Sequence, residues 1–288
     1  MTPPPPATHP ALQHSAFYRF VPLPHPALAA DAVRAAAHDL QGSVVLAPEG
    51  INGSVAGAPA AVARFEATLR AADFCHGAFQ GMTFKHSACL TPPFGRLKVA
   101  VKTEIVALGL PAAVSPGSPL PPPDETDASH LSPAQWRELL AQGQAVVLDN
   151  RNHFEFRLGH FLGAVDPQVH NFRDFVDYVL AQAPSWRAQQ KPVAMYCTGG
   201  IRCDKTAPWM RSLGLQVWQL EGGILNYFAQ LPDAQQDWQG ECFVFDNRVA
   251  LNTQLQETAH TVDGVFDPQH PDEAWRLQRA RRLDAGSS

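Results

Sequence analysis

The sequence predicts an α/β protein of two domains, an α+β sandwich followed by a parallel sheet flanked by helices. Three observations support this fold class. The N-terminal part shows a βαββαβ order of periodic segments, a proline-rich stretch then interrupts the hydrophobic pattern, and buried strands afterwards alternate with helices. With 288 residues, of which 45% are hydrophobic and 17% charged, the chain is long enough for each domain to have its own core.

The first domain is expected at residues 15–108, after a proline- and histidine-rich arm at 1–14 that should be disordered. Hydrophobic periodicity predicts strands at 16–23, 43–47 and 48–57, helices at 27–40 and 59–72, and two further strands around MTFKHSA and RLKVAVK. This order is typical of a ferredoxin-like (acylphosphatase-like) sandwich, in which two helices cover one antiparallel sheet.

The rest of the chain divides into a proline-rich linker at 109–131, a second domain at 132–235 and a C-terminal extension at 236–288. The second domain opens with a helix start signal, since Ser132 can act as N-cap with Pro133 in the first turn and Gln135 at the reciprocal capping position. Further on, strands are predicted at 146–151, 192–197 and 216–220, and helices at 171–182, up to Arg211 and at 223–228. This alternation indicates a small parallel sheet with helices on both faces.

Composition limits the functional classes. The formal net charge of −5 argues against broad non-specific binding of nucleic acid, but it leaves room for a local basic face. No apolar run approaches the roughly 20 residues of a membrane helix, and the N-terminus lacks the basic and apolar parts of a secretion signal. We therefore expect a cytoplasmic protein that does not bind membranes. Five scattered cysteines argue against a disulfide framework and leave at least one thiol free to react.

The segment CTGGIRCDKT, residues 197–206, raises the main chemical question. Cys197 ends a predicted strand and Asp204 is expected to begin a helix, so the loop between them curls at the carboxyl edge of a parallel sheet, where such folds bind ligands. Gly199 and Gly200 let backbone N–H groups point inward, and Arg202 adds a guanidinium, so the thiol pKa should fall from about 8.5 into the range of about 3.5 to 7.5. The remaining loop residues are Thr198 and Ile201. Taken alone, the segment suits a phosphatase, a metal site, a disulfide switch or a sulfur carrier.

Three segments in order resemble a rhodanese domain, namely VVLDNRNHFEFRLGHFLGA (146–164), YCTGGIRCDKT and QLEGGILNYF. The resemblance implies that Cys197 is the reactive sulfur and that Arg202 holds an anion or lowers the thiol pKa. Supporting roles are expected for Asp149, Arg151, Glu155 and Cys203. Cysteine phosphatases with a similar fold have one more residue between the cysteine and the arginine. The shorter loop therefore favours sulfur chemistry over phosphate chemistry.

Two segments of the first part of the chain narrow the resemblance. LAPEGINGSVAG and RLKVAVKTEIVALG, together with CTGGIRC, resemble the bacterial tRNA uridine-34 hydroxylase family over residues 16 to 250. Membership would imply formation of 5-hydroxyuridine at the wobble position, with tRNA as partner and molecular oxygen as co-substrate; no cofactor or stable protein partner is indicated. Many members carry a cysteine-rich stretch after the rhodanese domain, whereas Cys242 stands alone here.

Several alternatives stay open. His153 and Glu155 have the H-x-E spacing of an iron site, but they follow the strand where rhodanese domains place a structural carboxylate, so no metal is expected. Cys203 either resolves an oxidised Cys197 or simply packs. Cys197 either carries an oxidised or persulfide sulfur or adds to C6 of the uracil. The rival functions are a persulfide sulfurtransferase, fed by thiosulfate or a protein donor, and a non-catalytic rhodanese-type binding module.

Candidate RNA contacts lie mainly in the first domain. Arg96, Lys98 and Lys102 alternate along RLKVAVK, so on a strand they should share one face, either for RNA or for solvent. Asn52 lies in the glycine-rich turn that the family resemblance makes a candidate RNA-side loop. The basic tail RLQRARR (276–282) is the alternative contact.

Overall fold

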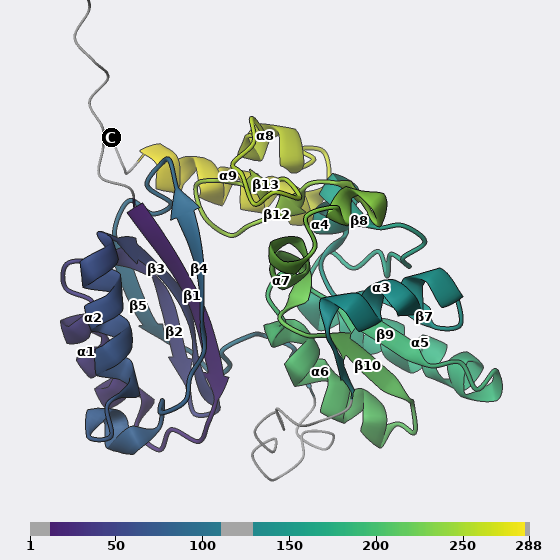
Figure 1. Ribbon diagram of the computed structural model, residues 1–288, viewed down its shortest axis with the longest axis horizontal. Coiled ribbons are helices and arrows are strands. Elements are labelled where there is room, and N and C mark those ends of the chain that lie inside the picture. Colours follow the sequence, from purple (N-terminus) through teal and green to yellow (C-terminus); the bar gives the residue numbers. More distant parts are fainter. Residues whose placement is uncertain (1–11, 111–128, 286–288) are drawn as a thin grey trace, which may run out of the picture. The chain divides into compact units, whose positions relative to one another are not determined.

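A computed structural model describes residues 12–110 and 129–285 of the chain, which form two compact units (Figure 1). The boundary between the units lies between Ile105 and Val106, three residues before the predicted end of the first domain. Most of the predicted linker, and residues 1–11 of the predicted arm, fall outside the described residues. Within the described ranges no helix is both long and apolar enough to cross a membrane.

The first unit confirms the predicted ferredoxin-like order, and the further strand predicted around RLKVAVK is present as well. Its elements are β1 (Leu12–Phe20), α1 (Pro26–Ala36), β2 (Gln41–Ala47), β3 (Gly50–Gly57), α2 (Pro59–Arg70), a 3-10 turn (Phe74–Gly77), β4 (Phe84–Cys89) and β5 (Leu97–Val101). The strand order is β4-β1-β3-β2-β5, and β5 pairs parallel with β2 while the other neighbours are antiparallel. The sheet is therefore mixed rather than wholly antiparallel. Since β1 begins at Leu12, residues 12–14 belong to the sheet and not to a disordered arm.

Both helices of the first unit cover the same face of this sheet (Figure 1). The core forms between alternate strand residues and the inner helix faces, with Val44 and Ile51 packing against Val33, Val62 and Phe65, all almost fully buried. The two-residue period of the strands thus selects the buried face, and burial of apolar side chains supplies the main driving force for the sandwich.

The second unit contains an all-parallel sheet in the order β6-β10-β9-β7. Its elements are β6 (His130–Leu131), α3 (Pro133–Gln142), β7 (Val146–Asp149), α4 (His153–Leu158), β8 (Gly159–Phe161), a 3-10 turn (Phe172–Asp174), α5 (Phe175–Ala188), β9 (Val193–Tyr196), α6 (Ile201–Ser212), β10 (Val217–Leu220) and α7 (Gly223–Gln230). This confirms the predicted parallel sheet flanked by helices. Residues 130–131 lie in the edge strand β6, although they were predicted to end the linker.

Helix α3 starts as its sequence predicts. The Ser132 hydroxyl accepts a hydrogen bond from the backbone N–H of Gln135 at 3.4 Å, and the Gln135 side chain accepts one from the Ser132 N–H at 2.9 Å. Pro133 occupies the first turn, where it has no helical N–H to lose. The local capping signal therefore fixes the start of this helix.

Strand β9 separates two cores. Val193 and Met195 face the core that contains α5 and α6, whereas Ala194 and Tyr196 face the core that contains α3 and α7. All four side chains are buried, as expected for a central parallel strand with helices on both faces. Cys197 follows directly and continues the face of Met195.

The C-terminal extension is part of the second unit. A 3-10 turn (Ala234–Gln236) leads into it, and it contains β11 (Trp238–Gly240), β12 (Cys242–Phe243), β13 (Ala250–Leu251), α8 (Val262–Val265) and α9 (Pro271–Ala285). Strand β11 pairs antiparallel with β8, and β12 packs beside α4 (Figure 1). The extension is therefore built onto the segment that precedes the cysteine loop in sequence.

Candidate active site

The cysteine loop is shorter than the sequence suggested. Strand β9 ends at Tyr196, and α6 begins at Ile201 rather than at Asp204. Gly200 acts as N-cap with φ of 102°, a conformation that residues with a Cβ rarely adopt, and the Asp204 N–H donates to the Gly200 carbonyl at 3.0 Å. An Asp favours helix starts, but here the glycine conformation ends the loop first. Arg202 consequently projects from the first turn of the helix and not from the loop.

The thiol of Cys197 is held as a buried thiolate. Its Sγ accepts a hydrogen bond from the Gly200 N–H at 3.1 Å, and the backbone N–H groups of Arg202 and Cys203 also point to it. Burial, the largest influence, raises the pKa of the Cys197 thiol; the hydrogen bond from the Cys203 side chain, the Arg202 charge and the backbone N–H groups outweigh it and lower the pKa to about 5. The sulfur is therefore charged at neutral pH.

The sulfur lies deeper than we expected. Although the loop lies at the carboxyl edge of the sheet, where such folds bind ligands, the Cys197 residue is only 1% exposed. The loop reaches the surface at Thr198 and Gly199, both partly exposed, and a Cβ built on Gly199 would meet no atom within 4 Å. The loop is therefore open to its surroundings at Gly199 and closed over the sulfur itself.

Arg202 is locked by a carboxylate from another helix. Its two terminal nitrogens each donate to one oxygen of Glu155 at 2.8 Å, and Nη2 also donates to the Thr198 hydroxyl at 3.3 Å. Glu155 is fully buried in the first turn of α4, where it also accepts the Asn152 N–H at 3.1 Å. Burial raises the pKa of Glu155, but the charge and hydrogen bonds of Arg202 outweigh it, so the pKa lies below the ordinary value and the pair is ionised.

Asp149 and Arg151 support the site from the opposite core. The guanidinium of Arg151 binds both oxygens of Asp149, at 2.8 and 2.6 Å, and the Gly159 carbonyl at 2.6 Å, and it lies 5.6 Å from the centre of the Tyr196 ring. Neither side chain has a hydrogen bond to the cysteine loop among the contacts of the described residues. Their pairing fixes the ends of β7, β8 and β9, and so positions the loop that follows β9.

Sequence reasoning missed Gly223 as a site residue. The N-terminus of α7 packs on the loop, where the Ile224 N–H donates to the Cys197 carbonyl at 3.0 Å and the Leu225 N–H to the Thr198 carbonyl at 3.2 Å. A Cβ on Gly223 would lie 2.4 Å from the Cys197 carbonyl oxygen, and its φ is 71°. The signal was the glycine pair in QLEGGILNYF, since paired glycines between a strand and a helix allow close backbone approach.

Comparison with known proteins agrees with this architecture. Residues 12–105 match the family model described as the UPF0176 acylphosphatase like domain, and residues 132–230 match the rhodanese-like domain. The tRNA uridine(34) hydroxylase of Nitrobacter winogradskyi is 40% identical over 264 residues, which covers 91% of this chain and 100% of that protein. The chain belongs to the tRNA uridine(34) hydroxylase family. The member from Deinococcus radiodurans is 42% identical, covering 88% of this chain and 81% of its own length, and the one from Bradyrhizobium diazoefficiens is also 42% identical, covering 84% and 92%.

In this member of the tRNA uridine(34) hydroxylase family, Cys203 is a neutral hydrogen-bond donor to Cys197. Burial, and then the hydrogen bond to Cys197, raise the pKa of the Cys203 thiol well above its ordinary value. Asn150 contacts Cys203 Sγ at 3.8 Å and also donates to Thr206. All five cysteines are free thiols in the structure, and the hydrogen bond from the Cys203 side chain lowers the pKa of Cys197.

The H-x-E pair is divided between two partners. Glu155 binds Arg202, whereas His153 Nδ1 lies 2.7 Å from Asp166 Oδ2. Across residues 12–110 and 129–285, no three His, Cys, Asp or Glu side chains are grouped to hold a metal ion.

The basic row of the first unit is less regular than predicted. Arg96, Lys98 and Lys102 are all exposed, but β5 spans only Leu97–Val101, so the first and last flank the strand. Val101 is 47% exposed and does not continue the buried face. The strict alternation therefore fails at the C-terminal end of the strand, although the three cations remain at the surface.

Asn52 is engaged in holding the end of the first unit. Its Nδ2 donates to the Ile105 carbonyl at 3.0 Å, and Glu49 accepts the Ile105 N–H at 2.7 Å. The PEGIN turn thus provides hydrogen-bond partners for both the N–H and the carbonyl of Ile105. The turn has a structural task, and we retain Asn52 as an RNA candidate only by family resemblance.

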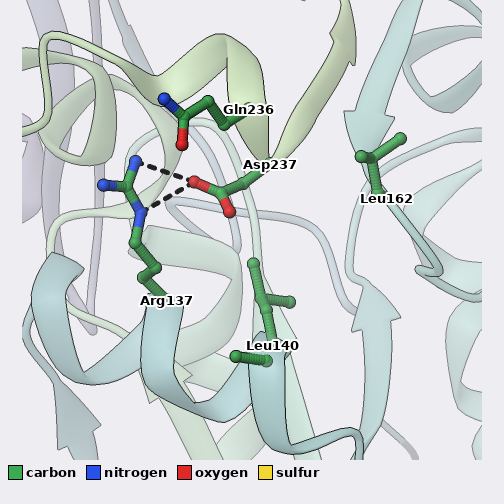
Figure 2. Close-up of a pocket in the computed structure, with 6 residues that line it drawn as sticks. Arg137, Leu140, Leu162, Gln236 and Asp237 are labelled. Atoms are coloured by element: carbon green, nitrogen blue, oxygen red, sulfur yellow. Dashed lines mark hydrogen bonds and ion pairs between the residues drawn. The ribbon is translucent and has the colours of Figure 1, made fainter.

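A surface pocket of about 210 Å³ is lined by α3 and by residues that follow β8 and precede β11 (Figure 2). Figure 2 shows Arg137 and Asp237 facing one another. Arg137 Nε donates to Asp237 Oδ2 at 2.8 Å. The other lining residues are Leu140, Ala141, Leu162 and Gln236. No predicted catalytic or RNA-binding residue lines it.

Proposed function

We propose that this protein hydroxylates C5 of uridine 34 in tRNA with molecular oxygen, and that Cys197 is the reactive group. One observation carries the assignment of the residue: Cys197 is a buried thiolate with a pKa of about 5, held by loop N–H groups, Cys203 and Arg202. The family membership described above supports the reaction. Its site of action is then the cytoplasm, where tRNA is found.

The thiolate is the nucleophile in this proposal. Sγ of Cys197 adds to C6 of the uracil, and the C5–C6 π electrons move to C5 and O4 as an enolate. The electron-rich C5 takes up molecular oxygen and a proton to give a hydroperoxide. Two molecules of a thiol reductant convert it to the C5 hydroxyl and water and become a disulfide. Loss of the C5 proton then expels the Cys197 thiolate, which restores the ring and the enzyme.

Arg202 positions charge and does not act as an open anion receptor. Because both terminal nitrogens are bound by Glu155, the guanidinium has little capacity left for a dianion such as thiosulfate. Its positive charge nevertheless favours the ionised form of Cys197. This arrangement supports a nucleophilic thiolate more than a thiosulfate-fed sulfurtransferase.

The test compares wobble uridines by mass spectrometry in a strain that lacks the gene and expresses variants. Wild-type protein and Cys242→Ser should both restore 5-hydroxyuridine, because burial raises the pKa of Cys242 to about 12 and leaves its thiol unreactive. Cys197→Ser should restore none. Growth under isotopically labelled oxygen should label the new hydroxyl.

Each rival function has its own result. Sulfur on the wobble uridine, or persulfide transfer from thiosulfate without hydroxylation, would identify a sulfurtransferase. Unchanged tRNA in every strain would leave only the binding module.

A further inference from the structure

The turn that joins β12 to β13 in the C-terminal extension presents one apolar side chain to solvent. Phe245 is 61% exposed, whereas its neighbour Val244 is 4% exposed and packs inward. Beneath it, Arg248 binds Asp246 through Nε at 2.8 Å and Nη2 at 2.7 Å, and both side chains are almost completely buried. The Val249 N–H also donates to the Asp246 carbonyl at 3.0 Å. The turn is thus held in one shape that projects this ring.

The ring lies beside the arginine of the active site. The guanidinium carbon of Arg202 is 5.8 Å from the centre of the Phe245 ring and 6.0 Å from that of Phe172. Phe245 packs edge-on against Phe243 at 5.0 Å and 88°, and Phe243 packs edge-on against Phe154 at 5.1 Å and 90°. Phe154 directly precedes Glu155, the partner of Arg202. A row of aromatic contacts therefore fixes Phe245 relative to the site.

Folding does not require this exposure. Phe243 already fills the core at this end of the unit, with 5% exposure. A phenylalanine that stays exposed to water does not gain the free energy of burying its apolar surface, and most phenylalanines in folded proteins are buried. An ordered, exposed aromatic ring next to a reactive group suits a partner with a flat apolar face. A nucleobase has such a face, and stacking on aromatic side chains is how proteins hold unstacked bases.

The proposed reaction needs such a partner. A base that reacts at C5 and C6 must leave its stacked neighbours, and contacts in the enzyme compensate for the lost stacking energy. The thiolate adds perpendicular to the ring plane, so it occupies one face of the uracil and leaves the other free. We infer that Phe245 stacks on that second face of uridine 34 and positions the base over the cysteine loop; this inference rests on the proposed function. Phe245 is then a positioning residue of the hydroxylase.

The experiment measures initial rates of 5-hydroxyuridine formation. Purified full-length protein is added to an extract of the strain without the gene, which supplies reductant and unmodified tRNA, at tRNA concentrations below KM. Phe245→Ala should lower kcat/KM by roughly 5- to 150-fold, the range expected for loss of one base–aromatic stack. Phe245→Tyr should keep the rate. Phe245→Leu, which keeps apolar area but no π face, should fall between them.

Two controls separate stacking from folding. Leu180→Ala removes a side chain from α5 that is 49% exposed and should leave the rate unchanged. The melting temperature of Phe245→Ala and the ionisation of Cys197 in it should stay close to those of the wild type, because the ring is mostly exposed and Arg202 keeps both hydrogen bonds to Glu155.

Several results would overturn the inference. A wild-type rate in Phe245→Ala would do so, as would a full rate in Phe245→Leu, a shifted Cys197 titration, or a change in oligomeric state that marks the ring as a protein contact. Absence of 5-hydroxyuridine with the wild-type protein would instead refute the proposed function itself.

Discussion

Replacing Arg202 by methionine should destabilise the protein and weaken its thiolate together. The substitution keeps most of the side-chain volume, but the fully buried Glu155 carboxylate loses both guanidinium hydrogen bonds and keeps the one from the Asn152 N–H. Removing one partner of a buried ion pair costs about 3 to 5 kcal/mol. In a unit of this size that corresponds to a fall in melting temperature of roughly 6 to 20 °C.

The double variant Arg202→Met with Glu155→Gln should recover most of this loss. It buries no unpaired charge, and a glutamine at position 155 can still accept the capping hydrogen bond from Asn152. The double variant therefore tests whether the single variant fails through an uncompensated carboxylate and not through a packing defect.

The dependence on pH has a definite sign. In the wild type the Glu155 pKa is lowered, so its contribution to stability is present above the unfolded value of about 4.3 and is lost as pH falls through the folded value. In Arg202→Met, burial is opposed only by the weaker effects of the Arg151 charge and the Asn152 N–H, so we expect the Glu155 pKa to rise and the carboxylate to be penalised more as pH rises. The difference in stability between wild type and Arg202→Met should grow between about pH 5 and pH 8.

Thermal denaturation across that pH range, with thiolate absorbance measured in parallel, provides the assay. Loss of the cation should raise the Cys197 pKa by roughly 1 to 3 units. Equal melting temperatures for the single and double variants, or a stability difference independent of pH, would refute the assignment of a buried charged pair. An unchanged thiol titration would show that Arg202 does not act on Cys197.

Three further results are expected. The thiolate absorbance of native Cys197 should persist as pH falls and disappear near pH 5, whereas the thiol of the unfolded chain has a pKa of about 8.5. The stability that the thiolate contributes is therefore present above the unfolded pKa and is lost as pH falls through 5. Cys197→Ser should lack this change. Gly223→Ala should lower the melting temperature and the hydroxylation rate, because its φ is 71° and the new Cβ would meet backbone 2.4 Å away, whereas Gly264→Ala, with no atom within 4 Å of its Cβ, should be tolerated; equal effects would contradict this. Replacing Arg96, Lys98 and Lys102 by alanine should flatten the slope of log tRNA affinity against log salt concentration by roughly 2 to 3, measured by filter binding. Cys197 should still ionise normally in this variant. An unchanged slope would place the RNA contact elsewhere.

Local signals predicted the frame of the protein well. The capping box at Ser132 and Gln135 and the run of buried residues in β9 depend on neighbours a few positions away, so the sequence displays them directly. The predicted starts of α6 and β1 were wrong, because a backbone conformation in one case and strand pairing in the other set the boundary. Gly200 at positive φ started α6 before Asp204 could, and pairing with Cys89 of β4 brought Leu12 into the sheet.

The candidate site was less predictable because its contacts span long stretches of chain. Arg202 meets Glu155 across 47 residues, and Gly223 meets Cys197 only because α7 returns to the loop. The depth of Cys197 depends on side chains from both α5 and α6, which no local pattern reveals. Phe245 had no motif at all, since an exposed aromatic is conspicuous only once its neighbours are seen to be buried.

Because side chains alternate along β9, the number of residues in this strand decides the face to which the Cys197 sulfur points. Val193, Met195 and Cys197 share one face of the strand, while Ala194 and Tyr196 share the other. Insertion or deletion of one residue in this strand would keep every residue type yet turn the thiol toward the aromatic core around Tyr196, away from the helix that ionises it. A change of two residues would restore the direction and alter only the reach. An insertion or deletion of an even number of residues in β9 therefore keeps the thiol on its present face, whereas an odd number turns it to the opposite face.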